Sequence, residues 1–269
     1  MNWYLVYNLF FAHIVADFYC QSEESCKNKK NSGFKGWHLY KHSLVVLLLT
    51  ATACWNVKMF FPAAIIGISH LILDGIKSLI ERKIADHNNA LAESNEKKTY
   101  GLLIFIVDQL LHIAIIMFCA WYFGKEWSQF PFLTDINPRI LMGVLALIVL
   151  AKPVNILVDV LFTEYTISPV KDKEKANDTS TPNGVPNSNS LELNNFHSGR
   201  IIGTLERWLI LLLVMLTQYE AIGFLIAAKS ILRFSETSKG TEKSEYVLVG
   251  TLFRFLIALS TGILILKIV

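Results

Sequence analysis

The chain has 269 residues, of which 53% are hydrophobic and only 17% are charged. Soluble proteins carry about a quarter charged residues, so this composition excludes an ordinary soluble domain. The net charge of +3 is too small to indicate a protein that binds nucleic acid.

Long uncharged stretches recur along the chain, for example at 113–123 and 255–266. Stretches of this kind predict helices that cross a membrane, and we expect an all-α fold, a polytopic transmembrane helical bundle. The seventh predicted helix is short, and it either spans the membrane or re-enters it. In chain order, the eight predicted helices cover residues 2–19, 39–57, 59–81, 100–123, 139–162, 203–219, 221–235 and 246–267.

Polar residues divide these helices into two predicted halves. Residues 1–123 form a His/Asp-rich membrane half with four helices, and residues 124–269 form a second membrane half. The segment 171–190, KDKEKANDTSTPNGVPNSNS, has no apolar anchors. We therefore expect it to be a disordered cytoplasmic linker.

Lys and Arg residues indicate the orientation of the chain in the membrane. They concentrate in the connections that follow the first, third, fifth and seventh predicted helices, and they are scarce in the other connections. Because basic connections stay on the cytoplasmic side, both termini should lie outside the cytoplasm.

Each of the first four predicted helices carries a pair of His or Asp residues four positions apart. This spacing places both side chains on one face of a helix. Charged side chains in the middle of a membrane cost about 2.5–3.5 kcal/mol each, so their presence needs a reason. The pairs are His13 with Asp17, His38 with His42, His70 with Asp74, and Asp108 with His112.

The order of the pairs repeats along the chain. HxxxD is followed by HxxxH, and then HxxxD is followed by DxxxH, which predicts a pseudo-repeat of two helical hairpins. The predicted orientation places all eight side chains at one depth below the cytoplasmic surface. Imidazole and carboxylate ligands together suit Zn, Mn or Fe, and eight groups suit one or two ions. The alternatives are a hydrogen-bonded network without metal, and a pathway for protons or ions.

Further charged residues lie near the same predicted face of the membrane. Basic side chains at such positions either reach toward lipid headgroups or hold an anionic group, for which phosphate is the main candidate. The substrate-binding candidates are Lys77, Lys152, Arg200, Glu206, Arg207 and Lys229.

An ordered set of motifs runs along the chain: HIVADFYCQ, HLYKH, HLILDGIK, DQLLH, GRIIGTLERWLI, AIGFLIAAKSILRF and EYVLVGTL. Together they resemble an uncharacterised bacterial integral membrane family, filed as domain of unknown function 3307. The resemblance implies a multi-pass protein of the bacterial inner membrane, and it supplies no activity. The His/Asp pairs are also distantly similar to those of membrane-bound metal-dependent hydrolases.

These patterns predict a metal-dependent hydrolase that acts at the cytoplasmic face on a phosphoester or lipid-linked substrate. The ion would activate water, and an uncoordinated Asp17 or Asp108 would serve as general base. One alternative is a transporter coupled to metal ions or protons, and another is a non-catalytic membrane partner or sensor. A pathway needs polar groups at both ends of the helices, whereas the outer halves here are nearly bare. Membrane lipids are the expected partners, and nucleic acid is not.

Overall fold

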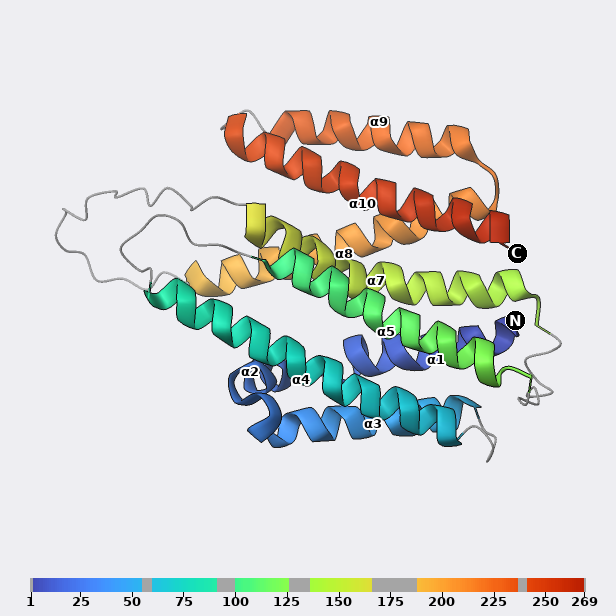
Figure 1. Cartoon of the computed structure of the whole chain (residues 1–269). Coiled ribbons are helices and arrows are strands. Elements are labelled where there is room, and N and C mark those ends of the chain that lie inside the picture. Colours follow the sequence, from blue (N-terminus) through green and yellow to red (C-terminus); the bar gives the residue numbers. More distant parts are fainter. Residues whose placement is uncertain are drawn as a thin grey trace. The chain divides into compact units, whose positions relative to one another are not determined.

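The computed structural model describes residues 2–54, 60–90, 100–125, 136–165, 188–236 and 241–268. Within these ranges the regular structure is entirely helical, which confirms the all-α prediction (Figure 1). The α-helices are α1 (Trp3–Ile14), α2 (Glu23–Ser32), α3 (Trp37–Cys54), α4 (Phe60–Ala90), α5 (Gly101–Phe123), α7 (Pro138–Tyr165), α8 (Ser188–Met215), α9 (Tyr219–Glu236) and α10 (Thr241–Ile268).

Every predicted helix overlaps a helix of the structure, but several bounds differ. Helix α4 runs to Ala90 instead of ending near residue 81. Helix α8 begins at Ser188, so the last three residues of the expected linker are helical, whereas 171–187 lie outside the described residues. The prediction missed α2 because its sequence, EESCKNKKNS, has no apolar periodicity. The side chain of Ser22 caps this helix by accepting a hydrogen bond from the backbone N–H of Ser25.

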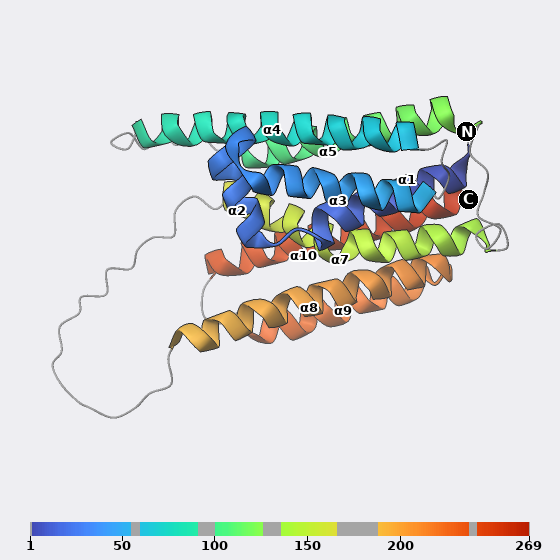
Figure 2. The same ribbon diagram turned by 90° about the horizontal axis from the view of Figure 1, so that it is seen from below.

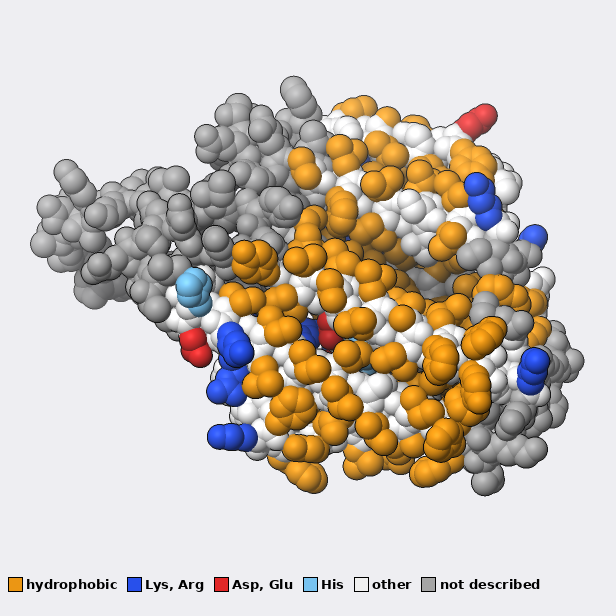
Figure 3. All heavy atoms as spheres, viewed as in Figure 1, with side chains coloured by type: hydrophobic (Ala, Val, Ile, Leu, Met, Phe, Trp, Pro, Cys, Tyr) orange, Lys and Arg blue, Asp and Glu red, His pale blue; other side chains and the backbone are white. Residues whose placement is uncertain are grey.

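Four of the described helices are long and apolar enough to cross a membrane. They are α4 over 60–88, α5 over 101–123, α7 over 138–161 and α10 over 249–267. Many large hydrophobic side chains on these helices are exposed, including Ile68 on α4 and Leu110 on α5. Figure 3 shows hydrophobic side chains over most of the visible described surface. These features indicate a membrane protein, while eight spanning helices and the pseudo-repeat of hairpins remain predictions.

The chain divides into two compact units. Unit 1 comprises Met1–Leu157 with Ile265–Val269, and unit 2 comprises Val158–Leu264. In unit 1, α1 packs against α3, α3 against α4, α4 against α5, and α5 against α1, which closes a ring of four helices. Figures 1 and 2 show these helices side by side, with the short α2 lying against α3 and α4.

The interior of unit 1 is mainly apolar on one side, where the polar residues Asn8 and Thr50 are also buried. Leu5 and Leu9 of α1 are buried with Val46 of α3 and with Ile116 and Cys119 of α5 in a single hydrophobic core. The helices continue from this core to a polar region, where α1 passes into a short π-helix, Val15–Tyr19. Single π-helical turns inside helices are frequent at functional sites. This turn carries one of the predicted site residues, Asp17.

Candidate metal centre

Seven of the eight predicted metal-binding residues meet in the interior of unit 1. The rings of His70 and His112 have their centroids 4.3 Å apart, those of His42 and His70 5.0 Å, and those of His13 and His112 5.3 Å. The ring of four helices and the π-helical turn that continues α1 supply these side chains, and they are buried or nearly so. We call the following set the His/Asp cluster: His13, Asp17, His42, His70, Asp74, Asp108 and His112.

Four atoms of the cluster have the spacing of metal ligands. Nε2 of His42 lies 3.0 Å from Nε2 of His70. Oδ1 of Asp17 is 3.4 Å from each of these nitrogens, and Oδ2 of Asp74 is 3.7 Å from His42 and 3.5 Å from His70. A tetrahedral ion with bonds of about 2.0–2.2 Å holds its ligand atoms about 3.3–3.6 Å apart. The observed distances bracket this range. The candidate ligand atoms of His42, His70 and Asp74 all lie within 4.8 Å of one another, which is close enough for these three groups to hold one transition-metal ion.

Several buried polar atoms of the cluster have no hydrogen-bond partner among the described residues. They are both ring nitrogens of His13, Nδ1 of His70, Nε2 of His112 and Oδ1 of Asp17. A buried polar group left unpaired costs about 1–3 kcal/mol, and such groups are rare in native structures. Their concentration in one place indicates that something other than protein completes these interactions.

The backbone sets the protonation of one imidazole. Nδ1 of His112 lies 2.8 Å from the carbonyl oxygen of Asp108, one turn earlier on α5. Because a carbonyl oxygen only accepts hydrogen bonds, Nδ1 carries the proton and donates it. The neutral ring then presents a lone pair at Nε2, which is the form that binds a metal or accepts a proton.

Two lysines are ion-paired with carboxylates of the cluster. Nζ of Lys29, on α2, lies 2.6 Å from Oδ2 of Asp74, and Nζ of Lys77 lies 2.7 Å from Oδ2 of Asp108. Lys77 was predicted to bind substrate, and in the structure its ammonium group forms an ion pair with Asp108. Sequence reasoning missed Lys29 because the lysines before α3 were used only to assign orientation. With neutral imidazoles, the three carboxylates exceed the two ammonium groups by one negative charge.

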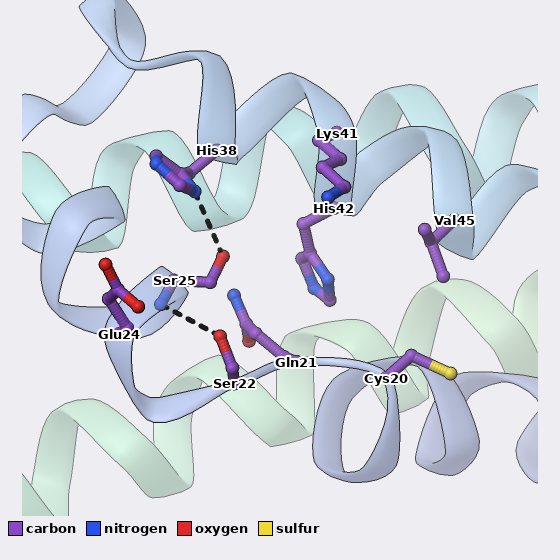
Figure 4. Close-up of a pocket in the computed structure, with 9 residues that line it drawn as sticks. All are labelled: Cys20, Gln21, Ser22, Glu24, Ser25, His38, Lys41, His42 and Val45. Atoms are coloured by element: carbon purple, nitrogen blue, oxygen red, sulfur yellow. Dashed lines mark hydrogen bonds between the residues drawn. The ribbon is translucent and has the colours of Figure 1, made fainter.

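His38, the eighth predicted ligand, lies apart from the cluster. Its Nδ1 is 3.5 Å from Oγ of Ser25, and its Nε2 is 3.4 Å from Nδ2 of Asn28. It lines a pocket of about 230 Å³ between the start of α2 and the first turns of α3 (Figure 4), which we call the α2 pocket. His42 lines the same pocket, so it belongs to both the pocket and the cluster.

The remaining substrate-binding candidates lie outside the cluster. Lys152 is exposed on α7 of unit 1, with Nζ 5.7 Å from the ring centroid of Tyr19. The others belong to unit 2. There, Arg200 pairs with Asp159 at 2.7 Å, Lys229 pairs with Glu206, and the fully buried Arg207 donates to Oγ1 of Thr204 at 3.0 Å.

The fold and the cluster together define the class, an all-α protein with membrane-length helices and buried histidines and aspartates in one four-helix unit. Residues 5–137 match the model of a family described as "Protein of unknown function (DUF3307)", and this stretch is therefore a domain of that family. The match contains the whole cluster and the α2 pocket, whereas the motifs from GRIIGTLERWLI onward lie outside it. No curated protein and no solved structure matches the chain.

Proposed function

We propose that the chain is a membrane-embedded metal-dependent hydrolase acting on a phosphoester or lipid-linked substrate. The observation that carries the proposal is the 3.0 Å separation of Nε2 of His42 and Nε2 of His70, with one carboxylate oxygen of Asp17 and one of Asp74 each 3.4–3.7 Å from both nitrogens. Two imidazoles with two carboxylates suit Zn, Mn or Fe. Such an ion would supply a Lewis acid and a water activated for attack near neutral pH.

Lys29 and Lys77 fit the surroundings of such a centre. Carboxylates that bind metals are commonly oriented by hydrogen bonds from neighbouring groups, and these neighbours influence metal affinity about 10–100-fold. Lys29 holds Asp74 in this way, while Lys77 and the side-chain amide of Gln109 hold Asp108. The two ammonium groups also reduce the repulsion among the carboxylates when the metal is absent.

His13 is better placed as general base than the two residues expected from the sequence. Asp17 contributes to the group of ligand atoms, and Asp108 already accepts hydrogen bonds from Lys77 and Gln109. Neither ring nitrogen of His13 has a hydrogen-bond partner among the described residues, and its Nδ1 lies 3.8 Å from Oδ1 of Asp17. A neutral imidazole beside the ligand atoms is suited to take a proton from water.

The surroundings of the cluster support a site rather than a transport pathway. On one side, His42 links the cluster to the α2 pocket. On the other side, the described core contains large apolar residues such as Leu5, Leu9 and Ile116. A transporter needs polar groups along the whole route, and on this side the apolar residues outnumber the buried polar ones, Asn8 and Thr50.

A second candidate function follows from the two Lys–Asp pairs. With Lys29 on Asp74 and Lys77 on Asp108, a single proton shared by the histidines would make the cluster electrically neutral. The cluster would then be a polar network that joins the four helices of a non-catalytic membrane protein. Metal content separates this candidate from the hydrolase.

We place the protein in the bacterial inner membrane with both termini outside the cytoplasm. The support is the concentration of Lys and Arg in alternate connections, including the stretch 27–35 that contains most of α2. In this orientation the α2 pocket and the cluster lie toward the cytoplasmic side.

Elemental analysis of protein purified without chelators tests the hydrolase. We expect one or two transition-metal ions per wild-type chain, and metal loss in His42→Ala and His70→Ala. His38→Ala is the matched control, because His38 lies one turn from His42 on α3 but outside the cluster, and this variant should keep its metal. Correctly folded wild-type protein that contains no metal and does not take up Zn, Mn or Fe would refute the proposal and favour the polar network.

A further inference from the structure

The α2 pocket is lined mainly by polar side chains, several of which can donate hydrogen bonds. Figure 4 shows Gln21 extending into the space between His38 and His42. The Nε2 of Gln21 is buried and has no partner among the described residues. Lys41 lines the same pocket, and its positive charge offsets the negative charge of Glu24. A buried amide donor beside an ammonium group favours an anionic ligand with oxygen acceptors.

A hydrogen-bond chain makes Ser25 a further donor. The side-chain amide of Asn28 lies 3.4 Å from Nε2 of His38 and donates to it, so Nδ1 of His38 carries the proton. That proton is directed to Oγ of Ser25, 3.5 Å away. With its oxygen accepting from His38, Ser25 has its own hydroxyl proton left to donate into the pocket. This chain gives His38 a positioning role that does not involve metal.

The α2 pocket has the volume for a small ligand and adjoins the His/Asp cluster. Its volume of about 230 Å³ is below the range of about 300–1,000 Å³ that is typical of sites for drug-sized ligands. A phosphate group with a short polar substituent fits this space. His42 forms one wall and contributes Nε2 to the four candidate ligand atoms. A group bound in the pocket is therefore next to the proposed metal.

We infer that the α2 pocket binds the phosphate of a small phosphomonoester, with Gln21, Ser25 and Lys41 as its donors. The inference deepens the proposed function and rests on it for the reaction, since hydrolysis needs the neighbouring cluster. Phosphate binding itself requires only the pocket. The phosphomonoester has two possible sources, a soluble molecule or the headgroup of a membrane lipid.

Calorimetric titration with inorganic phosphate tests the inference on the full chain in nanodiscs of phosphatidylcholine. Gln21→Ala and Lys41→Gln should each weaken phosphate binding about tenfold, because each removes one donor to an anion. Lys27→Gln is the control, since it removes an equal charge from α2 at a position that does not line the pocket. The metal content of every sample is measured in parallel, and we expect it to be unchanged.

The outcomes separate this inference from the proposed function. The inference that the α2 pocket binds phosphate is refuted, whatever the metal content, by either of two results. One is that the wild-type protein binds no phosphate, and the other is that wild type, Gln21→Ala and Lys41→Gln bind it with equal affinity. If the wild-type protein contains no metal but its phosphate binding still depends on Gln21 and Lys41, the phosphate-binding pocket is supported and the hydrolase is refuted. Repeating the titration in nanodiscs that also contain phosphatidic acid shows whether the phosphomonoester is a lipid headgroup or a soluble molecule. Loss of inorganic phosphate binding there assigns a lipid headgroup, and unchanged binding assigns a soluble phosphomonoester.

Discussion

Nε2 of His42 lies 3.0 Å from Nε2 of His70, although the two residues are 28 positions apart in the sequence. Their helices approach closely one turn away, where a Cβ atom added to Gly67 of α4 would lie 2.9 Å from Cβ of Leu47 on α3. Two imidazole lone pairs at this distance repel each other unless a proton or a cation lies between them. The close approach at Gly67 therefore holds these two nitrogens at a distance that suits either a shared proton or a bound cation.

Substitution of Gly67 should harm both the fold and the centre. In Gly67→Ala the new methyl group meets the Cβ of Leu47, which is fixed to the backbone, so α3 and α4 must separate. We expect a loss of about 1–3 kcal/mol in the free energy of unfolding, as for other overpacked interiors. Metal affinity should also fall, because His42 and His70 move apart. Thermal unfolding and metal titration measure the two effects.

Gly223→Ala is the matched control for that experiment. Gly223 lies within α9, and an added Cβ atom meets no described atom within 4 Å. Alanine favours a helix over glycine by about 1 kcal/mol, so this variant should be slightly more stable than wild type. If both glycine variants lose stability equally, the close approach at Gly67 is not the cause.

Removal of the Lys29 ammonium should destabilise the metal-free protein more than the metal-loaded protein. Lys29→Gln leaves the carboxylate of Asp74 buried without its cation, and breaking a buried pair of this kind costs about 3–5 kcal/mol. A bound divalent ion would compensate the same charge. Unfolding should be measured with and without Zn. An equal loss in the two states would show that no ion binds beside Asp74.

Lys30→Gln serves as the comparison for Lys29→Gln, since the two lysines are adjacent on α2. The Lys29 side chain is 12% exposed, whereas that of Lys30 is 53% exposed and lies 3.6 Å from Glu81. Exposed ion pairs contribute about 0–1 kcal/mol, so Lys30→Gln should change stability little in either metal state.

Lys77 and Asp108 should be strongly coupled. Their contact at 2.7 Å lies among buried groups of the cluster, so Lys77→Met and Asp108→Asn each leave one charge unpaired. The double variant should then be more stable than the sum of the single losses predicts, by about 1 kcal/mol or more. The more exposed pair of Arg200 with Asp159 should show a smaller coupling in the same assay. Additive losses for Lys77 and Asp108 would mean that other groups compensate these charges.

The sequence predicted most of the cluster because helical spacing is a local property. Asp108 and His112 share a face of α5 whatever the tertiary structure, and the apolar stretch around them requires that face to be buried. His38 met the same criterion as His42 but lies nearer the start of α3, where α2 covers it. Spacing alone could not separate these two histidines, since the difference depends on how a neighbouring segment packs.

Lys29 and the α2 pocket could not be predicted from local patterns. The contact between Lys29 and Asp74 joins residues 45 positions apart. It also depends on α2, a polar helix whose sequence resembles that of a loop. The same limit applies to α8, since SNSLELNN at its start is polar and continued the expected linker. For α2, packing against α3 and α4 decides the structure, and a single sequence does not reveal packing.

The orientation of the chain gives the last prediction. Cysteines introduced separately at Lys30 on α2 and at Lys125 after α5 should lie on opposite sides of the membrane, in a background where the four native cysteines are replaced. Because the basic connections should face the cytoplasm, an impermeant thiol reagent added to intact cells should label position 125 and not position 30. Permeabilised cells provide the control, since both positions should then react. Labelling at position 30 alone in intact cells would show that the orientation is the opposite of the predicted one. The α2 pocket would then open to the outside, where a cytoplasmic substrate could not reach it.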